Sequence, residues 1–557
     1  MSRKLKSLML AFFLILNMTS CTYNEDNNSI DPQETEEEQT VELPEPTKGG
    51  EMIISFRMPK TLNPLLNEDY TVDQVLKLVF DTLIDFDESQ NPIANLATDW
   101  TFSNDGTTIT INLRQGVQWH DGDPFTARDV IFSLDVIKNA PSTSPYKKCI
   151  ENIVSYKAEG DYTVKIFYNQ PFSGAVYALY FPVIPAHIYE TSSGQALLEK
   201  VPVGTGAYKL GEYKVAKELQ LEVNPAWFKG EPYIERIKVL VIPDEETELY
   251  SFEQGQIDLI GTNAVDWGKY AQSGESRVKE YVTSYYDFIG FNFNKVLFQD
   301  KKARKAVAYA IDKQNILENQ YLNHGVLTDV PISPTSWLYC DEIEKYNYDI
   351  EKAKELLAES GWSDSDNDGV LDKTMNGSKI DFIFNLLVES EDETRKEAAR
   401  EIIKMLSELG IKVNLEEVSK EEFLIRLQEK NFDAFIGGWK LSPIPDFTFA
   451  FHSSQIENGS NFISFRSEQM DSLLEKAFTA VGEENMKMAY DELQKYIADE
   501  LPYISLYFRN AALITHDRIQ GELKPQRDFY IGNIKDWFIY EPEKMNKAAN
   551  RACFVLF

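Results

Sequence analysis

Cysteine and histidine are scarce in this chain of 557 residues, which has four cysteines and five histidines. Cys21 is followed only by Cys149, Cys340 and Cys553, an odd number of widely separated thiols, so no disulfide framework or metal-binding cysteine cluster is expected. The histidines stand at positions 120, 187, 324, 452 and 516, which match none of the spacings of a zinc site. The sequence therefore indicates neither a metal centre of these kinds nor a cofactor.

Basic residues and long apolar runs are also in short supply. The chain has 56 lysines and arginines against 89 aspartates and glutamates, and its formal net charge of −33 argues against nucleic acid as a partner. The apolar run at residues 8–16 is too short to span a bilayer, and no other run is long enough. His-Glu-x-x-His, Gly-x-Ser-x-Gly and phosphate-loop motifs are missing, so catalysis is not expected.

The first segment, residues 1–21, reads as a signal peptide. Basic residues at positions 3, 4 and 6 precede the short apolar run at 8–16, which is the order found in secretory signals. The run ends at Met18-Thr19-Ser20-Cys21, which resembles a bacterial lipobox, although Met18 stands where leucine is usual. We expect lipid attachment at Cys21, which would hold the protein at a membrane surface without a spanning helix. The alternative is a plain secretory signal.

Residues 22–47 form a second segment with few apolar side chains. It is acidic, with Glu36-Glu37-Glu38 at its centre, and its prolines discourage regular structure. Such a composition is typical of a disordered, self-repelling tether. The remaining chain is long enough for several domains, and its 43% hydrophobic content can supply large cores.

Residues 97–137 carry the clearest local structure signals of the folded part. Alternating apolar residues on both sides of Asn104-Asp105-Gly106 predict a hairpin over residues 100–113. Thr126 and Asp129 have the spacing of a capping box, so a helix is expected to begin there.

This stretch also resembles the signature of the family 5 extracellular solute-binding proteins, the peptide- and nickel-binding subunits of ABC importers. The matching residues are Trp100, Asp105-Gly106, Leu113-Arg114-Gln115-Gly116-Val117, Trp119-His120-Asp121-Gly122 and Ala127-Arg128-Asp129-Val130. Further similarities lie at residues 201–210, 224–230, 254–259 and 291–312, and the resemblance covers about residues 49–539. We expect the signature itself to shape local structure and not to contact the ligand.

The resemblance implies an α/β, two-lobed periplasmic-binding-protein type II-like fold with an extra domain inserted in the N-terminal lobe. Two strands near residues 289–294 and 501–508 would cross between the lobes. The implied divisions are lobe 1 at 48–288 with an inserted domain at about 82–200, lobe 2 at 289–508, a return to lobe 1 at 509–541, and an uninterpreted tail at 542–557.

Patterning adds three local predictions. Residues 237–242 are nearly continuously apolar, which is typical of a strand in a sheet covered on both faces. The β-α-β order over residues 393–436 favours a mostly parallel sheet. Ser419 and Glu422 predict a capped helix that buries Phe423, Leu424 and Leu427.

Residues 435–451 are the predicted ligand site, because they follow a strand and ligands of α/β folds bind beyond the carboxyl ends of strands. Gly438 would bring bare backbone to the edge, and Trp439 would offer a large rigid face. In peptide-binding relatives a Trp-x-x-Asp motif supplies a carboxylate for the peptide α-ammonium. Here Ser442 stands at that position, and Asp446 is the candidate replacement. Alternatively, Trp439 belongs to the core and Asp446 caps a helix.

Two further candidates are weaker. Asn461 and Phe465 resemble the Asn-x-x-x-Tyr/Phe segment that the family has near the ligand site. Asp364, Asp366 and Asp368 resemble a calcium loop with Asp372 at the ninth position, but the twelfth position is a methionine and the bidentate glutamate is absent. A solvated turn rich in aspartate is the preferred interpretation.

The predicted function is therefore that of an extracellular substrate-binding subunit of an ABC transporter, lipid-anchored at the outer face of a bacterial cytoplasmic membrane. It would capture peptides between its lobes, closing on a ligand held by Trp439 on one side and residues 204–206 on the other, and deliver them to the membrane permease as a monomer. Nickel complexes and oligosaccharides remain alternative ligands. An extracellular hydrolase and a surface adhesin are the rival classes.

Overall fold

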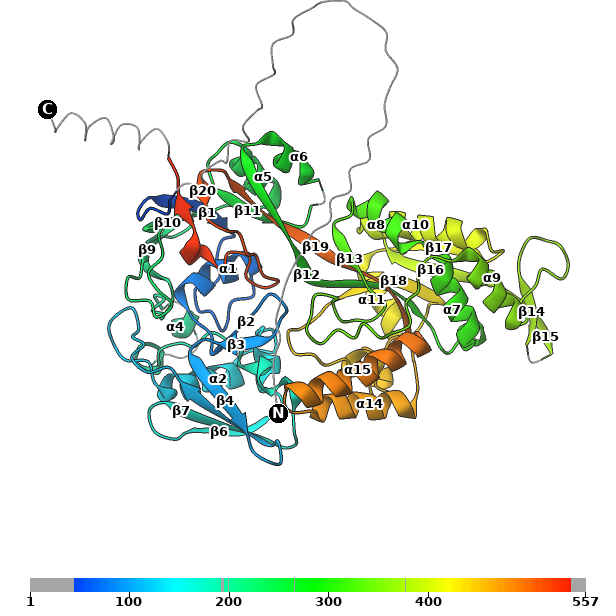
Figure 1. Cartoon of the computed structure of the whole chain (residues 1–557), viewed down its shortest axis with the longest axis horizontal. Helices are drawn as coiled ribbons and strands as arrows, with labels where there is room; N and C mark the ends of the chain where they lie inside the picture. Colours follow the sequence, from blue (N-terminus) through cyan, green and yellow to red (C-terminus); the bar gives the residue numbers. More distant parts are fainter. Residues whose placement is uncertain (1–44, 192–194, 199, 265, 376, 542–557) are drawn as a thin grey trace, which may run out of the picture. The chain divides into compact units, whose positions relative to one another are not determined.

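The computed structural model describes residues 45–541, except 192–194, 199, 265 and 376 (Figure 1). The predicted signal peptide, Cys21, nearly all of the tether and the tail at 542–557 lie outside this part. Within it, no helix combines the length and the apolar character needed to cross a membrane. Two bodies are distinguished below: the first comprises residues 46–275 and 517–541, the second residues 292–502, and two long strands run between them.

The first body contains two four-stranded sheets. One has the order β1-β10-β9-β8, with β1 parallel to β10 and the other pairs antiparallel. Its strands are β1 (Glu51–Phe56), β8 (Tyr208–Lys214), β9 (Glu218–Val223) and β10 (Arg236–Val241). Burial in β10 alternates: Ile237 and Val239 are buried, whereas Lys238 and Leu240 are partly exposed. The prediction that this strand is covered on both faces is met in part: Ile237 and Val239 pack in the first body's core, and on the other face Leu240 packs against a separate cluster around Phe252, whereas Lys238 is partly exposed.

The second sheet confirms the hairpin predicted from the signature stretch. Its order is β4-β5-β7-β6, and its strands are β4 (Ala97–Phe102), β5 (Thr108–Leu113), β6 (Ile153–Ala158) and β7 (Thr163–Tyr168). Gly106 turns the chain between β4 and β5 at a φ of 69°, which favours glycine. Helix α2 (Ala127–Asn139) begins at Thr126 with the predicted capping box to Asp129. Both sheets share one core, which also includes residues of α1 (Tyr70–Val79).

The signature stretch packs against a second family-like motif. The backbone N–H of His120 donates to the Gly204 carbonyl (2.9 Å), the Gly204 N–H donates to His120 Nδ1 (3.2 Å), and His120 Nε2 bonds the Gly206 carbonyl (3.0 Å). Burial lowers the pKa of His120 to about 4, so the ring is neutral at pH 7, as these bonds require. A side chain at Gly204 or Gly206 would collide with the end of α1. The two motifs therefore hold the first body together.

The crossing strands are longer than predicted: β12 spans Ser276–Phe291 and β19 spans Tyr503–His516. They pair antiparallel and form the middle of a seven-stranded sheet of order β11-β19-β12-β18-β16-β17, with β13 also paired to β19. The other strands are β11 (Leu259–Thr262), β13 (Gly325–Leu327), β16 (Ile383–Glu389), β17 (Lys412–Val418) and β18 (Ala434–Lys440). The three strands of the β-α-β stretch, β16, β17 and β18, pair in parallel as predicted, but the remaining pairs are antiparallel, so the sheet as a whole is mixed and not mostly parallel. The lobe boundaries drawn from the resemblance stay predictions.

Helices cover the second body's part of this sheet (Figure 1). They are α7 (Lys301–Ala310), α8 (Lys313–Tyr321), α9 (Ile350–Glu359), α10 (Glu393–Ser407), α11 (Lys420–Gln428), α14 (Glu468–Thr479) and α15 (Glu483–Glu500). Helix α11 begins at the Ser419 cap as predicted, and it buries Phe423 and Leu427. Leu424 is 47% exposed, so its predicted burial is wrong: the narrow apolar face of α11 leaves it on the solvent side.

Candidate functional site

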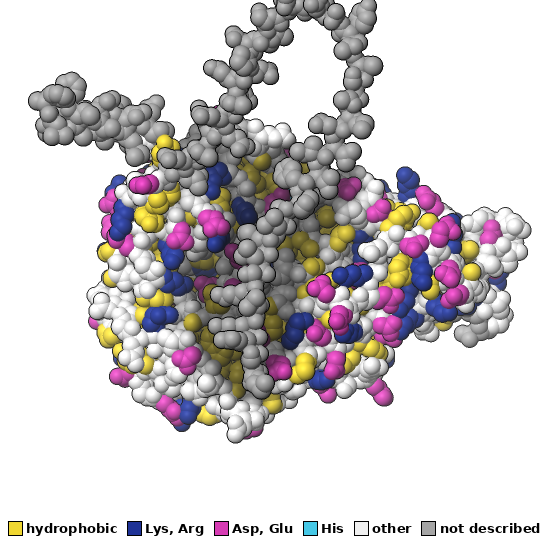
Figure 2. Space-filling model, in the orientation of Figure 1, with side chains coloured by type: hydrophobic (Ala, Val, Ile, Leu, Met, Phe, Trp, Pro, Cys, Tyr) yellow, Lys and Arg dark blue, Asp and Glu magenta, His cyan; other side chains and the backbone are white. Residues whose placement is uncertain are grey.

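A cleft of about 690 Å³ is lined by residues of both bodies and of the crossing strands. This volume is in the range of ligand-binding pockets. The first body contributes the turn after β2 (Ile84–Phe86), residues around Tyr177 and residues 522–528. The second body contributes residues 331–333, 335, 336, 338, 439–447 and 449. The face drawn in Figure 2 is hollowed between the region of β4 to β7 and that of α14 and α15, with hydrophobic side chains on its walls.

Trp439 lies on the cleft wall, at the end of β18. Its ring stacks on Phe462 with centroids 5.8 Å apart, meets Phe449 edge-on at 5.1 Å and lies 6.2 Å from Phe288. It is partly exposed. The side chain thus takes part in an aromatic cluster on one side and faces the cleft on the other, so it can pack against a ligand without reorganising.

Ser442 and Asp446 also line the cleft. The Asp446 carboxylate accepts a hydrogen bond from the backbone N–H of Thr448 (2.8 Å), at the start of the short helix α12 (Thr448–Phe451). No ion pair of Asp446 is found among the described residues. Asp446 therefore binds the first N–H of α12 from the position before the N-cap residue Phe447, which is close to the alternative interpretation, and its second carboxylate oxygen stays available in the cleft. Lys440 is the cationic residue closest to Asp446 in the sequence, but its Nζ lies over the rings of Tyr70 and Tyr285.

Two predicted site residues do not line the cleft. Gly438 lies over a buried ion cluster, where a Cβ atom would collide with Asp287 and Arg395. Asn461 is fully buried, and its amide bonds the carbonyls of His452 and Phe465 and the N–H of Phe465. Both residues thus have structural contacts that account for their identity. Gly204, Thr205 and Gly206 do not line this cleft either, and their contact with a ligand stays a prediction.

Several cleft residues of the first body belong to no pattern that predicts a ligand site. Phe86, Phe172, Tyr177 and Tyr180 present aromatic rings to the cleft, and Arg527 adds a guanidinium group. They come from short or irregular segments far apart in the sequence, without a recognisable motif. Only the resemblance, applied to the folded chain, could have suggested them.

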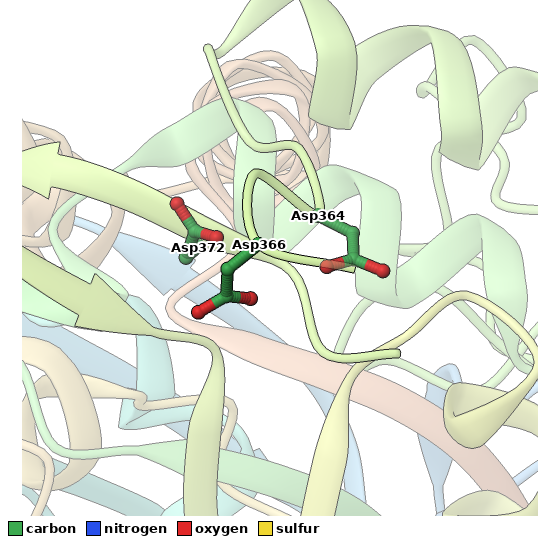
Figure 3. Close-up of side chains that lie close together, drawn as sticks. All are labelled: Asp364, Asp366 and Asp372. Carbon is green, nitrogen blue, oxygen red and sulfur yellow. The ribbon is translucent and has the colours of Figure 1, made fainter. Parts of the chain in front are cut away.

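The aspartate-rich loop brings together Asp364, Asp366 and Asp372, each of which offers an oxygen within 4.8 Å of the others (Figure 3). Asp368, which the sequence suggested as a ligand, instead accepts a bond from the Val370 N–H. The carboxylates of Asp364, Asp366 and Asp372 also have partners within the protein. Asp364 accepts the N–H groups of Asp368 and Gly369, Asp372 accepts the N–H and hydroxyl of Ser365, and Lys379 pairs with Asp366 and Asp372. This pattern favours the solvated turn.

The comparison with known families decides the class of protein. Residues 91–461 match the model of the bacterial extracellular solute-binding proteins, family 5 (middle region). The chain belongs to this family. The family consists of binding proteins that work outside the cytoplasm, and the two-lobed, α/β, type II-like fold implied by the resemblance is thereby confirmed.

Relatives match over nearly the whole chain. The oligopeptide-binding protein AppA of Bacillus subtilis is 28% identical over 562 residues, which cover 96% of this chain and 99% of that protein. The dipeptide-binding protein of Escherichia coli is 26% identical over 505 residues, covering 85% and 90%. The structure of the B. subtilis oligopeptide-binding protein in complex with a nonapeptide is 27% identical and aligns with a TM-score of 0.63 over 89% of this chain and 100% of that one.

Proposed function

We propose that this solute-binding protein is the substrate-binding subunit of an ABC importer and that it binds peptides in the cleft between its lobes. The observation that carries this proposal is the end-to-end similarity to an oligopeptide-binding protein solved with a nonapeptide, combined with a cleft lined from both sides. The rival hydrolase gains no support, because the sequence lacks the motifs of a catalytic centre and the relatives named above are binding proteins.

The cleft chemistry suits a peptide. Aromatic faces such as Trp439 can pack on varied side chains, while main-chain hydrogen bonds hold the peptide backbone. We infer that Asp446 pairs with the peptide α-ammonium in place of the carboxylate that Ser442 lacks. Asp446 has the right charge, lies in the cleft and has no ion-pair partner among the described residues.

Native mass spectrometry of the purified protein tests the ligand class. We expect co-purified peptides, each of which should bind the emptied protein about tenfold more tightly than its N-acetylated form, because a charge-assisted hydrogen bond is lost on acetylation. In Asp446→Asn the two forms should bind equally. A co-purified oligosaccharide or nickel complex with no peptide would refute the peptide proposal, and an acetylation effect that persists in Asp446→Asn would refute the role of Asp446.

We further propose that Cys21 is lipid-modified, so that a monomeric protein is held by its acidic tether at the outer face of the cytoplasmic membrane, close to the permease. The support is the basic, then apolar, then small-residue order of residues 1–21. Cell fractionation should find the wild type in the membrane fraction and Cys21→Ala in the soluble fraction. Equal retention of both proteins would contradict lipid anchoring.

A further inference from the structure

The side chain of Tyr177 packs in a different hydrophobic cluster from its neighbours in the first body. It opens the short helix η3 (Tyr177–Leu179), and its neighbours Val176, Ala178 and Leu179 are buried in the first body's core. Tyr177 itself is only 5% exposed, but it is buried in a different cluster, whose other buried members all come from residues 286–508. One aromatic side chain of the first body is therefore inserted into the core of the second.

Trp337 of the second body binds this inserted side chain. Its indole N–H donates to the Tyr177 hydroxyl at 3.0 Å, and its backbone N–H donates to the carbonyl of Ser89 at 3.0 Å. Ser89 lies in the turn between β2 and β3 (Pro92–Ala94) of the first body. Phe86, from the same turn region, stacks on the Tyr177 ring with centroids 5.8 Å apart and an interplanar angle of 29°.

Apolar contacts between the bodies lie close to these bonds. The rings of Phe172 and Phe478 are 5.0 Å apart, and a Cβ atom at Gly174 would lie 2.6 Å from the Ile444 side chain. Phe172, Tyr177 and Ile444 line the cleft, whereas Trp337 does not. The contact between the bodies therefore borders the ligand space, and Trp337 stands behind it.

We propose that Trp337, Tyr177 and Ser89 form a latch that stabilises the closed arrangement of the lobes, so that Trp337 sets ligand affinity although it lies outside the ligand cleft. These bonds join residues of different bodies, so they exist only while the bodies are together. A contact that exists in the closed state but not in the open state shifts the equilibrium between these states toward closure, in the same way as a ligand does. The ligand contacts then have to supply less of the free energy that favours closure. Trp337 is a positioning residue that acts through Tyr177.

The test compares Trp337→Phe, which keeps an aromatic ring but removes the indole N–H, with the wild type. The affinity measurement rests on the proposed function and uses a peptide identified by mass spectrometry. Loss of one hydrogen bond should raise the dissociation constant about threefold to tenfold, mainly through faster dissociation. Tyr177→Phe should have a similar effect, and the double variant should be no weaker than the weaker single variant, because both changes remove the same bond.

Trp227→Phe is the matched control. The Trp227 indole N–H donates to Asp81 at 3.2 Å, but both residues lie in the first body, so its loss should leave affinity unchanged. A dissociation constant of Trp337→Phe within twofold of the wild type, or single effects that multiply in the double variant, would overturn the latch.

Solution scattering of the ligand-free proteins is a second test, which needs no peptide. The double variant is expected to have a larger radius of gyration than the wild type, because more molecules are open. If no peptide binds the wild type, the proposed function fails and the latch is judged on this comparison alone. Equal radii in that case would overturn it.

Discussion

Replacing Asp287 by asparagine is expected to lower the free energy of unfolding by about 3–5 kcal/mol, the cost of leaving buried charges without their partner. Asp287 lies in β12 and is 1% exposed. One carboxylate oxygen accepts the Nε (3.1 Å) and Nη2 (2.6 Å) of Arg395 at the start of α10, and the other accepts Nε of Arg509 in β19. Asparagine keeps the shape of the side chain but cannot balance two guanidinium groups.

Asp287 supplies the negative charge that balances both buried arginines. Burial alone lowers the pKa of Arg509, but the adjacent Asp287 charge more than offsets this and holds the pKa well above its usual value. Asp392 adds a weaker contact to Arg509 at 3.3 Å. The cluster joins both crossing strands to α10, at the point where the pairing register of β12 and β19 shifts. Its loss should therefore also loosen the connection between the lobes.

Urea-induced unfolding measures the effect of Asp287→Asn. The control is Glu492→Gln, which breaks an ion pair with Lys476 in which both side chains are 52% exposed. A surface pair of this kind should change stability by less than about 1 kcal/mol. If Asp287→Asn cost no more than Glu492→Gln, the buried cluster would have no special role in stability.

Local signals made much of the first body predictable. An Asp-Gly turn, alternating side chains and a capping box act over a few neighbouring residues, so β4, β5 and the start of α2 are found where the pattern indicates them. The ends of β12 were harder to predict. The stretch from Ser276 to Tyr285 shows no regular alternation in burial, and its pairing with β19 is interrupted between Val282 and Tyr286.

The cleft was predictable only in part, for a physical reason. Trp439 follows a strand in a recognisable motif, whereas Tyr177 and Trp337 are 160 positions apart and become partners only when the lobes meet. Asn461 and Gly438 are the converse case, because they were expected at the ligand site and neither lines this cleft. Their resemblance to ligand-site residues could not reveal that the folded chain satisfies the asparagine amide internally, or that the glycine makes room for Asp287 and Arg395.

Trp439→Ala is expected to weaken peptide binding by about 30-fold or more, the effect of truncating an aromatic anchor worth about 2 kcal/mol. Trp439→Phe is the matched control, because a phenyl ring can keep the stacking on Phe462 and the edge contact with Phe449. We expect it to lose less than about fivefold in affinity. Calorimetric titration with an identified peptide measures both variants, and wild-type affinity in Trp439→Ala would leave this tryptophan as a core residue only.

The same variant tests how the cleft works. Moving a lobe equilibrium from 1:99 to 99:1 requires about 5.5 kcal/mol of preference for the closed state. Backbone hydrogen bonds at about 1 kcal/mol each and burial against Trp439 can together supply much of it. The wild type should therefore have a smaller radius of gyration at saturating peptide than without it. Trp439→Ala should keep the ligand-free radius at the same peptide concentration, because the contact that differs most between the two states is gone. An unchanged radius in the wild type, with binding demonstrated in the same sample, would mean that ligand capture in this protein does not depend on lobe closure.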